Sequence, residues 1–332
     1  MVKAMGVKAL ALLLVLALLL GGCQAESRQT EDKTLRIVTT IFPIYDWVRE
    51  LTRDRDNVEL TLLQDAGVDL HSYQPSTEDM VKIAACDLFI FVGGESDEWA
   101  EKALGSGENK KRRVLNLLEI LGDAALAEEE KEGMQEEEGH DHDHEHEAEE
   151  AAADEHVWLS LKNADLFVEQ ISLTLKEMDI EHKSLYEKNE SSYRQSLKAL
   201  AEEYAAAARE ASTHTLIFAD RFPFRYLTEE LGQDYFAAFP GCSAETEASF
   251  ETIIFLVKKL DELNLGYILS TESSDGRMAE TIKNSSAAGN QKLLVLDSLQ
   301  SVTREKISQG ASYLSIMRAN LTVLREAMGC GR

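Results

Sequence analysis

Four histidines alternate with acidic residues in one short run of this sequence, a spacing suited to metal binding. The run reads Gly-His-Asp-His-Asp-His-Glu-His and contains His140, His142, His144 and His146. Imidazole nitrogens and carboxylate oxygens are ligands for zinc, copper and nickel. The surrounding residues 128–155 hold no aromatic or β-branched side chain, so they are predicted to form a disordered insertion. A flexible run loses entropy when it binds, which predicts weak auxiliary metal sites or only a solvated acidic linker.

Two other histidines stand alone in predicted loops and are candidate ligands of a tighter site. His71 lies in the segment Gly-Val-Asp-Leu-His-Ser-Tyr-Gln-Pro, and His156 lies in Asp-Glu-His-Val-Trp-Leu-Ser, at the exit of the acidic insertion. A lone histidine is more often structural, but two in loops, one beside a metal-attracting run, make ligation and a structural role comparable alternatives. Asp297 ends an apolar run and is either a third ligand or a helix N-cap. His182 and His214 are predicted to be structural or exposed.

The elements that must position these side chains are strands alternating with helices. Strands are predicted at 35–41, 58–63, 88–92, 114–117, 215–219, 235–239, 267–270 and 293–296. Helices are predicted at 76–85, 163–178, 183–211, 222–231, 250–263, 277–286 and 312–328. Such alternation predicts mainly parallel sheets covered on both faces, which is an α/β fold.

The helix at 183–211 separates two α/β patterns and reaches roughly 40 Å at about 1.5 Å per residue. We therefore predict two open-sheet α/β lobes, at 34–182 and 212–332, joined by this helix. A ligand is expected in the cleft between the lobes, because open sheets bind ligands at the carboxyl ends of their strands.

The amino-terminal segment predicts an exported lipoprotein. Two lysines precede an apolar run at 9–20, which is followed by Gly-Gly-Cys23. The run is too short to span a bilayer but suits a signal peptide, here 1–22. Small residues before a cysteine resemble a lipobox, so Cys23 is predicted to be lipidated and to anchor the protein outside the cytoplasm. The polar residues 23–33 would form a tether.

The net charge of −26 excludes nucleic acid as a partner, since an acidic chain repels phosphate and attracts cations. Cys86, Cys242 and Cys330 would share an oxidising compartment, where they could form one disulfide whose pairing the sequence does not decide. No Cys-X-X-Cys occurs, which argues against a thiolate metal cluster.

Several segments resemble the metal-binding solute receptors of ABC importers, the group that takes up zinc or manganese. The matching segments are 67–75, 87–94, 156–160, 272–282, 295–297 and 313–320. The resemblance spans 35–328 and implies two α/β lobes on a long helix with a metal between them. It implies His71, His156 and Asp297 as ligands, an ABC permease as partner, and a monomer.

The chain departs from that family at the fourth ligand, where Arg221 stands in place of His or Glu. A guanidinium has no lone pair to donate, so it cannot ligate. Asp220, Glu245, Glu247 or a water could supply the fourth donor. Arg221 would then lie beside the site, paired with Asp297 or Glu245.

Two imidazoles with carboxylates favour Zn2+. Mn2+ would accept the same donor atoms and is the alternative, although it prefers more oxygen ligands. The sequence therefore predicts a zinc receptor that hands its metal to an ABC permease, and not an enzyme. A metal-dependent surface adhesin is a rival. A zinc hydrolase is a remote one, because no His-Glu-X-X-His motif is present.

Overall fold

The computed structural model describes residues 33–105, 111–135, 152–243 and 247–331. The helices and strands belong to the unit Leu35–Arg332. The predicted signal peptide, Cys23 and the four alternating histidines lie outside the described residues. Within the described ranges, no helix combines the length and apolarity needed to cross a bilayer.

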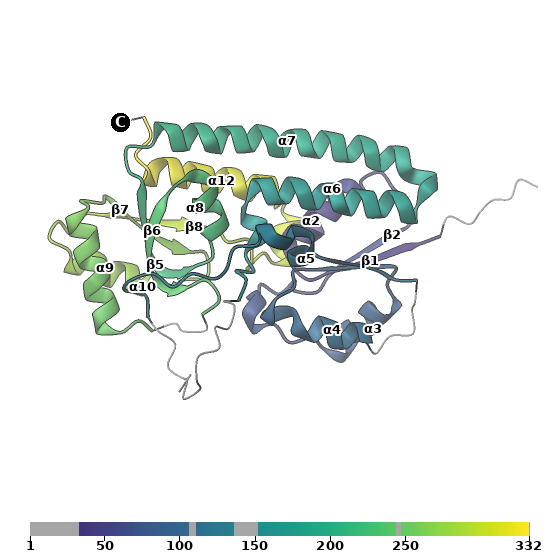
Figure 1. The fold of residues 1–332 in the computed structure, drawn as a ribbon, viewed down its shortest axis with the longest axis horizontal. Helices are drawn as coiled ribbons and strands as arrows, with labels where there is room; N and C mark the ends of the chain where they lie inside the picture. Colours follow the sequence, from purple (N-terminus) through teal and green to yellow (C-terminus); the bar gives the residue numbers. More distant parts are fainter. Residues whose placement is uncertain (1–32, 106–110, 136–151, 244–246, 332) are drawn as a thin grey trace, which may run out of the picture. The chain divides into compact units, whose positions relative to one another are not determined.

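The first lobe is built on a four-stranded parallel sheet in the order β2-β1-β3-β4 (Figure 1). Its strands are β1 (Leu35–Thr39), β2 (Val58–Leu62), β3 (Leu88–Phe91) and β4 (Arg113–Asn116). Its helices are α2 (Phe42–Leu51), α3 (Thr77–Ala85), α4 (Glu98–Gly105), α5 (Leu117–Leu121) and α6 (Leu161–Met178). Along β3, Leu88 and Ile90 face one apolar cluster while Phe89 and Phe91 face another. A strand apolar at every position is thus buried on both faces, as predicted.

The second lobe repeats this topology, with strand order β6-β5-β7-β8, all parallel. Its strands are β5 (Thr215–Phe222), β6 (Asp234–Pro240), β7 (Tyr267–Thr271) and β8 (Lys292–Leu296). Its helices are α8 (Arg225–Leu231), α9 (Phe250–Glu262), α10 (Arg277–Ser285), α11 (Arg304–Ser308) and α12 (Tyr313–Ala327). Leu216 and Phe218 of β5 face the core shared with the first lobe, whereas Ile217 and Ala219 face α9 and α10.

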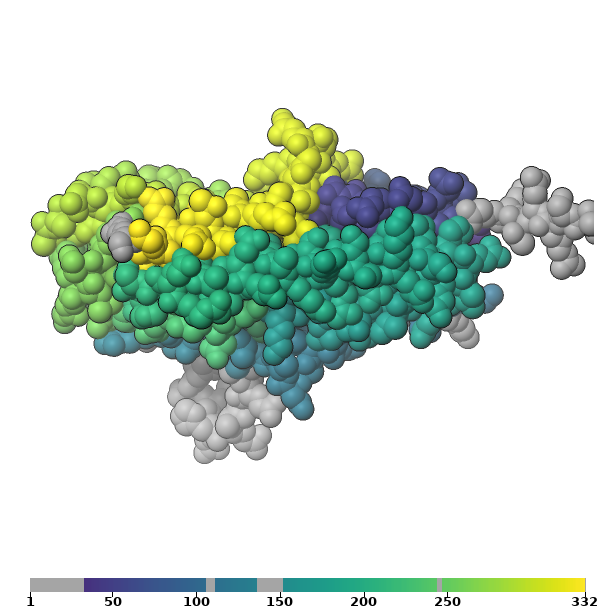
Figure 2. Space-filling model, turned by 90° about the horizontal axis from the view of Figure 1, so that it is seen from above, coloured from purple at the N-terminus to yellow at the C-terminus, as the bar shows by residue number. Residues whose placement is uncertain are grey.

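The long helix α7 (Lys183–Glu210) packs against helices of both lobes, namely α2, α6, α8 and α12. Figure 1 shows it running along α6 and α12, and Figure 2 shows α12 beside it from above. Its buried side chains follow one stripe, at Tyr186, Tyr193, Leu197, Leu200 and Tyr204. One apolar cluster runs from the first lobe along this stripe into the second, so the two lobes share a core.

Helix starts follow the capping residues in the sequence. Ser76 and Ser312 accept from the third residue of α3 and α12, each within a capping box. One predicted start is wrong, because β5 continues to Phe222 and α8 begins only at Arg225. The register shift between Phe218 and Arg221 lengthens β5, a tertiary feature that local propensity does not encode.

The predicted insertion at 128–155 is too long at both ends. Ala127 and Ala153 form an antiparallel bridge, and the Glu128 N–H donates to the Ala152 carbonyl at 2.7 Å. The Gln135 N–H donates to the Ala238 carbonyl of β6 at 2.8 Å. The isolated bridge and the bond to β6, an edge strand, order both ends of the insertion. Composition misjudged these residues because their partners lie elsewhere in the chain.

The environment of Asp46 on α2 should make the free energy of unfolding depend on pH. Its buried carboxylate pairs with Arg49 and accepts the Tyr313 N–H of α12 at 2.7 Å. Burial raises the pKa of Asp46 to about 6, against the opposing charge of Arg49. The folded state therefore binds the carboxyl proton of Asp46 more tightly than the unfolded state does. The resulting stabilisation of the folded state is lost as the pH rises from about 4 to about 6.

The Asp46→Asn variant stays neutral throughout and keeps an acceptor for the Tyr313 N–H. Relative to the wild type, its free energy of unfolding is expected to rise by about 2 kcal/mol between pH 4 and pH 7. Urea titrations of both proteins at the two pH values measure this difference. Parallel pH profiles for the two proteins would contradict it.

Candidate metal centre

The candidate residues gather where strands end in both sheets. His71 lies on the short 3-10 helix Leu70–Ser72 that follows β2, and Ser96 follows β3. Cys242 follows β6, and Asp297 follows β8. His156 comes directly before Val157–Leu159, the turn that leads into α6. The carboxyl ends of parallel strands lie on the same side of a sheet, so the loops that follow them meet there even when they are far apart in the chain.

His71 and His156 face each other through the same ring nitrogen. Their Nε2 atoms lie 3.2 Å apart, and the ring centroids lie 5.2 Å apart. His156 is fully buried, and the His71 side chain is only 10% exposed. The structure thus brings together two histidines that are 85 positions apart in the sequence.

The other nitrogen of each ring is held by an oxygen. The His71 Nδ1 lies 2.7 Å from the Ser96 Oγ and 3.5 Å from the Glu155 Oε2. The His156 Nδ1 lies 3.0 Å from the Asp154 Oδ1, which also accepts the His156 N–H at 2.8 Å. Such contacts fix ring orientation and leave the two neighbouring Nε2 atoms as the potential donors, as in metal-binding histidines.

Charge around the pair favours one shared positive centre. Burial, followed by the neighbouring His156, lowers the pKa of His71, so this ring is neutral. Burial opposes charge on His156, but the Asp154 carboxylate outweighs it and raises the pKa of His156. Either a proton shared by the two Nε2 atoms or a cation bound to both would supply this positive charge.

Glu155 is held close to the pair by a tight turn after β3. Its Oε1 accepts the Ser96 N–H at 2.9 Å. Gly94, with φ of 81°, admits it, since a Cβ there would lie 2.3 Å from the Glu155 Oε1. Burial raises the pKa of Glu155, and its Oε2 has no hydrogen-bond partner among the described residues.

Cys242 supplies the third potential donor. The ligand atoms of His71, His156 and Cys242 all lie within 4.8 Å of one another. Within the described part of the chain, no other set of three His, Cys, Asp or Glu donors meets this criterion. No disulfide joins the described cysteines 86, 242 and 330, so the Cys242 thiol is free.

Arg221 lies beside the site, but with a partner other than the predicted ones. Its guanidinium donates to the Asp69 carboxylate at 2.9 Å and to the Ser243 carbonyl at 3.3 Å. Asp69 in turn accepts the His71 N–H at 3.0 Å. The predicted pairing with Asp297 is therefore wrong, because the longer β5 carries Arg221 toward the loop of His71.

Asp297 does not belong to the three-donor group among the described residues. Its Oδ1 accepts the Leu299 N–H at 2.8 Å. Burial, reinforced by the charge of Glu272, raises the pKa of Asp297 to about 6. Glu272 accepts hydrogen bonds from the backbone and the hydroxyl of Ser298 at 2.7 and 2.8 Å.

The alternative fourth donors are placed differently. The Asp220 Oδ2 accepts the Thr271 N–H at 3.0 Å and the Thr271 hydroxyl at 2.6 Å, so it is engaged within the second sheet. Glu247 is exposed and lines another pocket. Glu245 lies outside the described residues.

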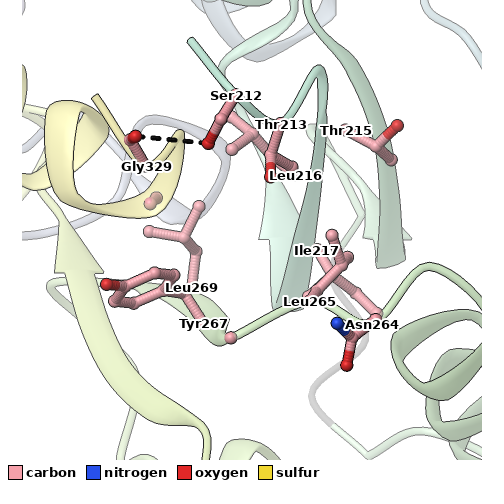
Figure 3. A pocket seen from close by; sticks show the side chains of 12 residues that line it. Ser212, Thr213, Thr215, Leu216, Ile217, Asn264, Leu265, Tyr267, Leu269 and Gly329 are labelled. Carbon is pink, nitrogen blue, oxygen red and sulfur yellow. Dashed lines mark hydrogen bonds between the residues drawn. The ribbon is translucent and has the colours of Figure 1, made fainter. Parts of the chain in front are cut away.

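A pocket of about 60 Å³ lies at the opposite end of the strands of the second sheet. Figure 3 shows the residues that line it. It lies where β5 and β7 begin, among Leu216, Tyr267 and Asn264, and the Ser212 Oγ donates to the Gly329 carbonyl there at 3.2 Å. It contains no His, Cys, Asp or Glu, so it offers no metal ligands.

Comparison of the sequence with protein-family models identifies a matching family. The sequence model of the family described as "Zinc-uptake complex component A periplasmic", ZnuA, matches residues 37–327. The chain belongs to this family. The family is a component of an uptake complex and not an enzyme, as the sequence predicted. Its description also supports the predicted extracytoplasmic location.

Individual members of the family are similar along most of the chain. The high-affinity zinc uptake system protein ZnuA of Bacillus subtilis is 30% identical over 91% of this chain and 90% of its own length. The zinc-binding lipoprotein AdcA of Streptococcus pneumoniae is 31% identical over 93% of this chain. The chain spans only 58% of that relative's length.

A solved structure within the family confirms the predicted fold class. The Zn(II)-bound ZnuA-like domain of Streptococcus pneumoniae AdcA aligns with a TM-score of 0.69 and 28% identity. The alignment covers 89% of this chain and 99% of that domain. Two parallel-sheet lobes on a long helix are thus the fold of the family.

Sequence reasoning did not select Asp154, Glu155, Ser96 or Cys242 as site residues. The two acidic residues resemble the end of the acidic run, although they directly precede His156. Ser96 and Cys242 each come a few residues after an apolar strand, in a Gly-Gly and a Pro-Gly turn. Their position after strand ends was the only available signal.

Proposed function

We propose that this protein is an extracytoplasmic receptor that captures one Zn2+ between its lobes and delivers it to an ABC permease. His71 and His156 are proposed as ligands. The observation that carries the proposal is the meeting of their Nε2 atoms at 3.2 Å, with both Nδ1 atoms engaged by oxygens.

That separation suits one shared ion. Zinc bonds imidazole nitrogen at about 2.0 to 2.1 Å, and tetrahedral geometry then separates two nitrogens by about 3.3 Å. No movement of either ring is needed to reach this spacing. Two nitrogen donors favour Zn2+ over Mn2+, which prefers oxygen.

The acidic side chains around the pair support capture of a cation. Asp69, Asp154 and Glu155 each contact a histidine of the pair, and one guanidinium, that of Arg221, lies among them. In a buried site these charges act at low dielectric, where their effect on an ion is larger than in water. Asp297 remains a proposed further carboxylate donor, reached by a movement of the loop after β8.

The membrane attachment is proposed from the amino-terminal sequence. Residues 1–22 would be removed and a lipid on Cys23 would hold the protein beside its permease, with 23–33 as tether and the protein as a monomer. Relatives named as lipoproteins support this. The alternating histidines at 140–146 are proposed as auxiliary weak sites that raise the local zinc concentration.

Metal titration of the full chain tests the proposal. We compare the wild type with a variant in which residues 136–151 are replaced by a short glycine-serine linker. Both proteins are expected to bind one zinc tightly by isothermal titration and metal analysis, and only the wild type to show further weak binding. Loss of the tight site in the linker variant would assign tight binding to the alternating histidines and overturn the proposal.

Asp154 is expected to set the zinc affinity through His156. Asp154→Asn keeps the size of the side chain but removes the charge that orients the His156 ring. Because loss of such a partner costs roughly 10- to 100-fold in metal affinity, the zinc dissociation constant should rise by that factor, with one-to-one stoichiometry kept. The same substitution at Asp165, which pairs with Arg194 on α7, is the control. Equal affinities for the two variants would contradict a ligand role for His156.

A further inference from the structure

We propose that the Cys242 thiolate is the third protein ligand of the zinc ion. This inference rests on the proposed function and specifies the donor set of that site. It would give the metal two imidazole nitrogens and one sulfur, with a carboxylate or water in the remaining position.

The turn that carries Cys242 is pressed against the histidine pair. A Cβ on Gly241 would lie 3.0 Å from the His156 Cε1 and 2.9 Å from the Phe222 carbonyl oxygen, so only glycine allows this approach. The Cys242 N–H donates to the Glu128 Oε1 at 3.0 Å. The Arg221 guanidinium holds the Ser243 carbonyl on the other side. Contacts on three consecutive residues thus fix the backbone around the thiol.

Because Arg221 stands in place of the fourth ligand implied by the family resemblance, the zinc ion needs a donor from elsewhere. The Arg221 guanidinium cannot ligate and is engaged by the Asp69 carboxylate. Arg221 is therefore not a ligand, but its hydrogen bond to the Ser243 carbonyl helps to position the turn that carries Cys242. Within the described residues, this thiol is the only additional donor grouped with the two histidines.

The thiol can reach a shared ion by rotation of its own side chain. Zinc bonded at about 2.0 Å to nitrogen and about 2.3 Å to sulfur separates those atoms by about 3.6 Å. The donor atoms lie within 4.8 Å in this structure, so an inward shift of the Sγ by about 1 Å would suffice. A χ1 rotation moves a sulfur by this distance while the backbone stays in place.

Coordination replaces one bond to the sulfur. The S–H bond breaks, a Zn–S bond forms, and the proton leaves to water. A bound divalent ion deprotonates a coordinating thiol outright. Sulfur is a soft donor, so this site should discriminate against Mn2+ more than one completed by oxygen.

Spectroscopy of the full chain at less than one equivalent of metal tests the inference. Zinc K-edge absorption should detect one sulfur neighbour at about 2.3 Å, and Co2+ should give a thiolate-to-metal charge-transfer band in the near ultraviolet. Cys242→Ser should lose both signals and bind zinc more than about tenfold more weakly, since a lost ligand costs at least as much as a lost ligand-orienting contact. Cys330→Ser is the matched control, because Cys330 contacts the Ala207 carbonyl of α7 instead.

The outcomes separate this inference from the proposed function. Tight one-to-one binding without a sulfur neighbour, or signals unchanged in Cys242→Ser, would overturn the ligand role and leave the receptor assignment standing. Absence of tight binding in every protein would remove the receptor assignment itself. If the Cys242→Ser variant fails to fold, alkylation of the wild type by iodoacetamide tests the ligand role instead. Zinc should slow the alkylation of Cys242, as followed by mass spectrometry. Alkylation at an equal rate with and without zinc would refute the ligand role.

Discussion

Replacing His71 or His156 with alanine is expected to abolish tight one-to-one zinc binding. Each substitution removes one of the two Nε2 donors that meet at 3.2 Å. Loss of a contact that only orients a ligand already costs roughly 10- to 100-fold, so loss of the ligand should cost at least about 100-fold. That factor corresponds to about 3 kcal/mol of binding free energy. Isothermal titration against a competing chelator measures it.

A thermal readout separates ligand loss from misfolding. Zinc that binds only the folded state raises the melting temperature of the wild type. Both variants should unfold cooperatively without zinc and lose the zinc-dependent rise. His214→Ala is the control, because that side chain is exposed at the start of β5 and should leave binding unchanged. A full zinc response in either His71→Ala or His156→Ala would show that the metal binds elsewhere.

Trp158→Ala is expected to destabilise the folded protein by about 3 to 5 kcal/mol. Trp158 is fully buried at the junction of the two lobes. Its indole N–H donates to the Ser298 carbonyl after β8 at 2.9 Å, and its own carbonyl accepts the Tyr313 hydroxyl of α12 at 2.7 Å. Truncation would therefore leave a cavity and a buried carbonyl without its donor.

The same tryptophan supports the proposed metal centre, since its ring centroid lies 5.3 Å from that of His156. Zinc affinity should fall together with stability in Trp158→Ala. Trp158→Phe keeps most of the packing and should lose roughly 1 to 3 kcal/mol, the cost of an unsatisfied buried group. Urea unfolding of the three proteins provides the measurement. A loss below 1 kcal/mol in Trp158→Ala would show that the junction repacks.

Local patterns predicted the described strands β1 to β8, because an apolar strand is encoded over a few residues, but they did not predict the helices α2, α4, α5 and α11. The apolar run at 88–92 became β3 with both faces buried, and Ser76 caps α3. Local patterns did not predict the extension of β5 to Phe222 or the pairing of residues 127 and 153, since both depend on strands distant in the chain. Predictions made from composition failed in the same way at Asp154 and Glu155, which look like the end of an acidic linker yet are buried.

By itself, the sequence determined the α/β class and the two-lobed order of elements, and it singled out two loop histidines that the fold brings together, because hydrophobic period and loop position are local properties. Only the tertiary structure decided which oxygens hold each imidazole, that Arg221 turns to Asp69, and that a thiol from the turn after β6 lies beside the pair. Parallel strands bring loops from distant parts of the chain to one edge, so the neighbours of a side chain there are set by packing and not by spacing along the chain.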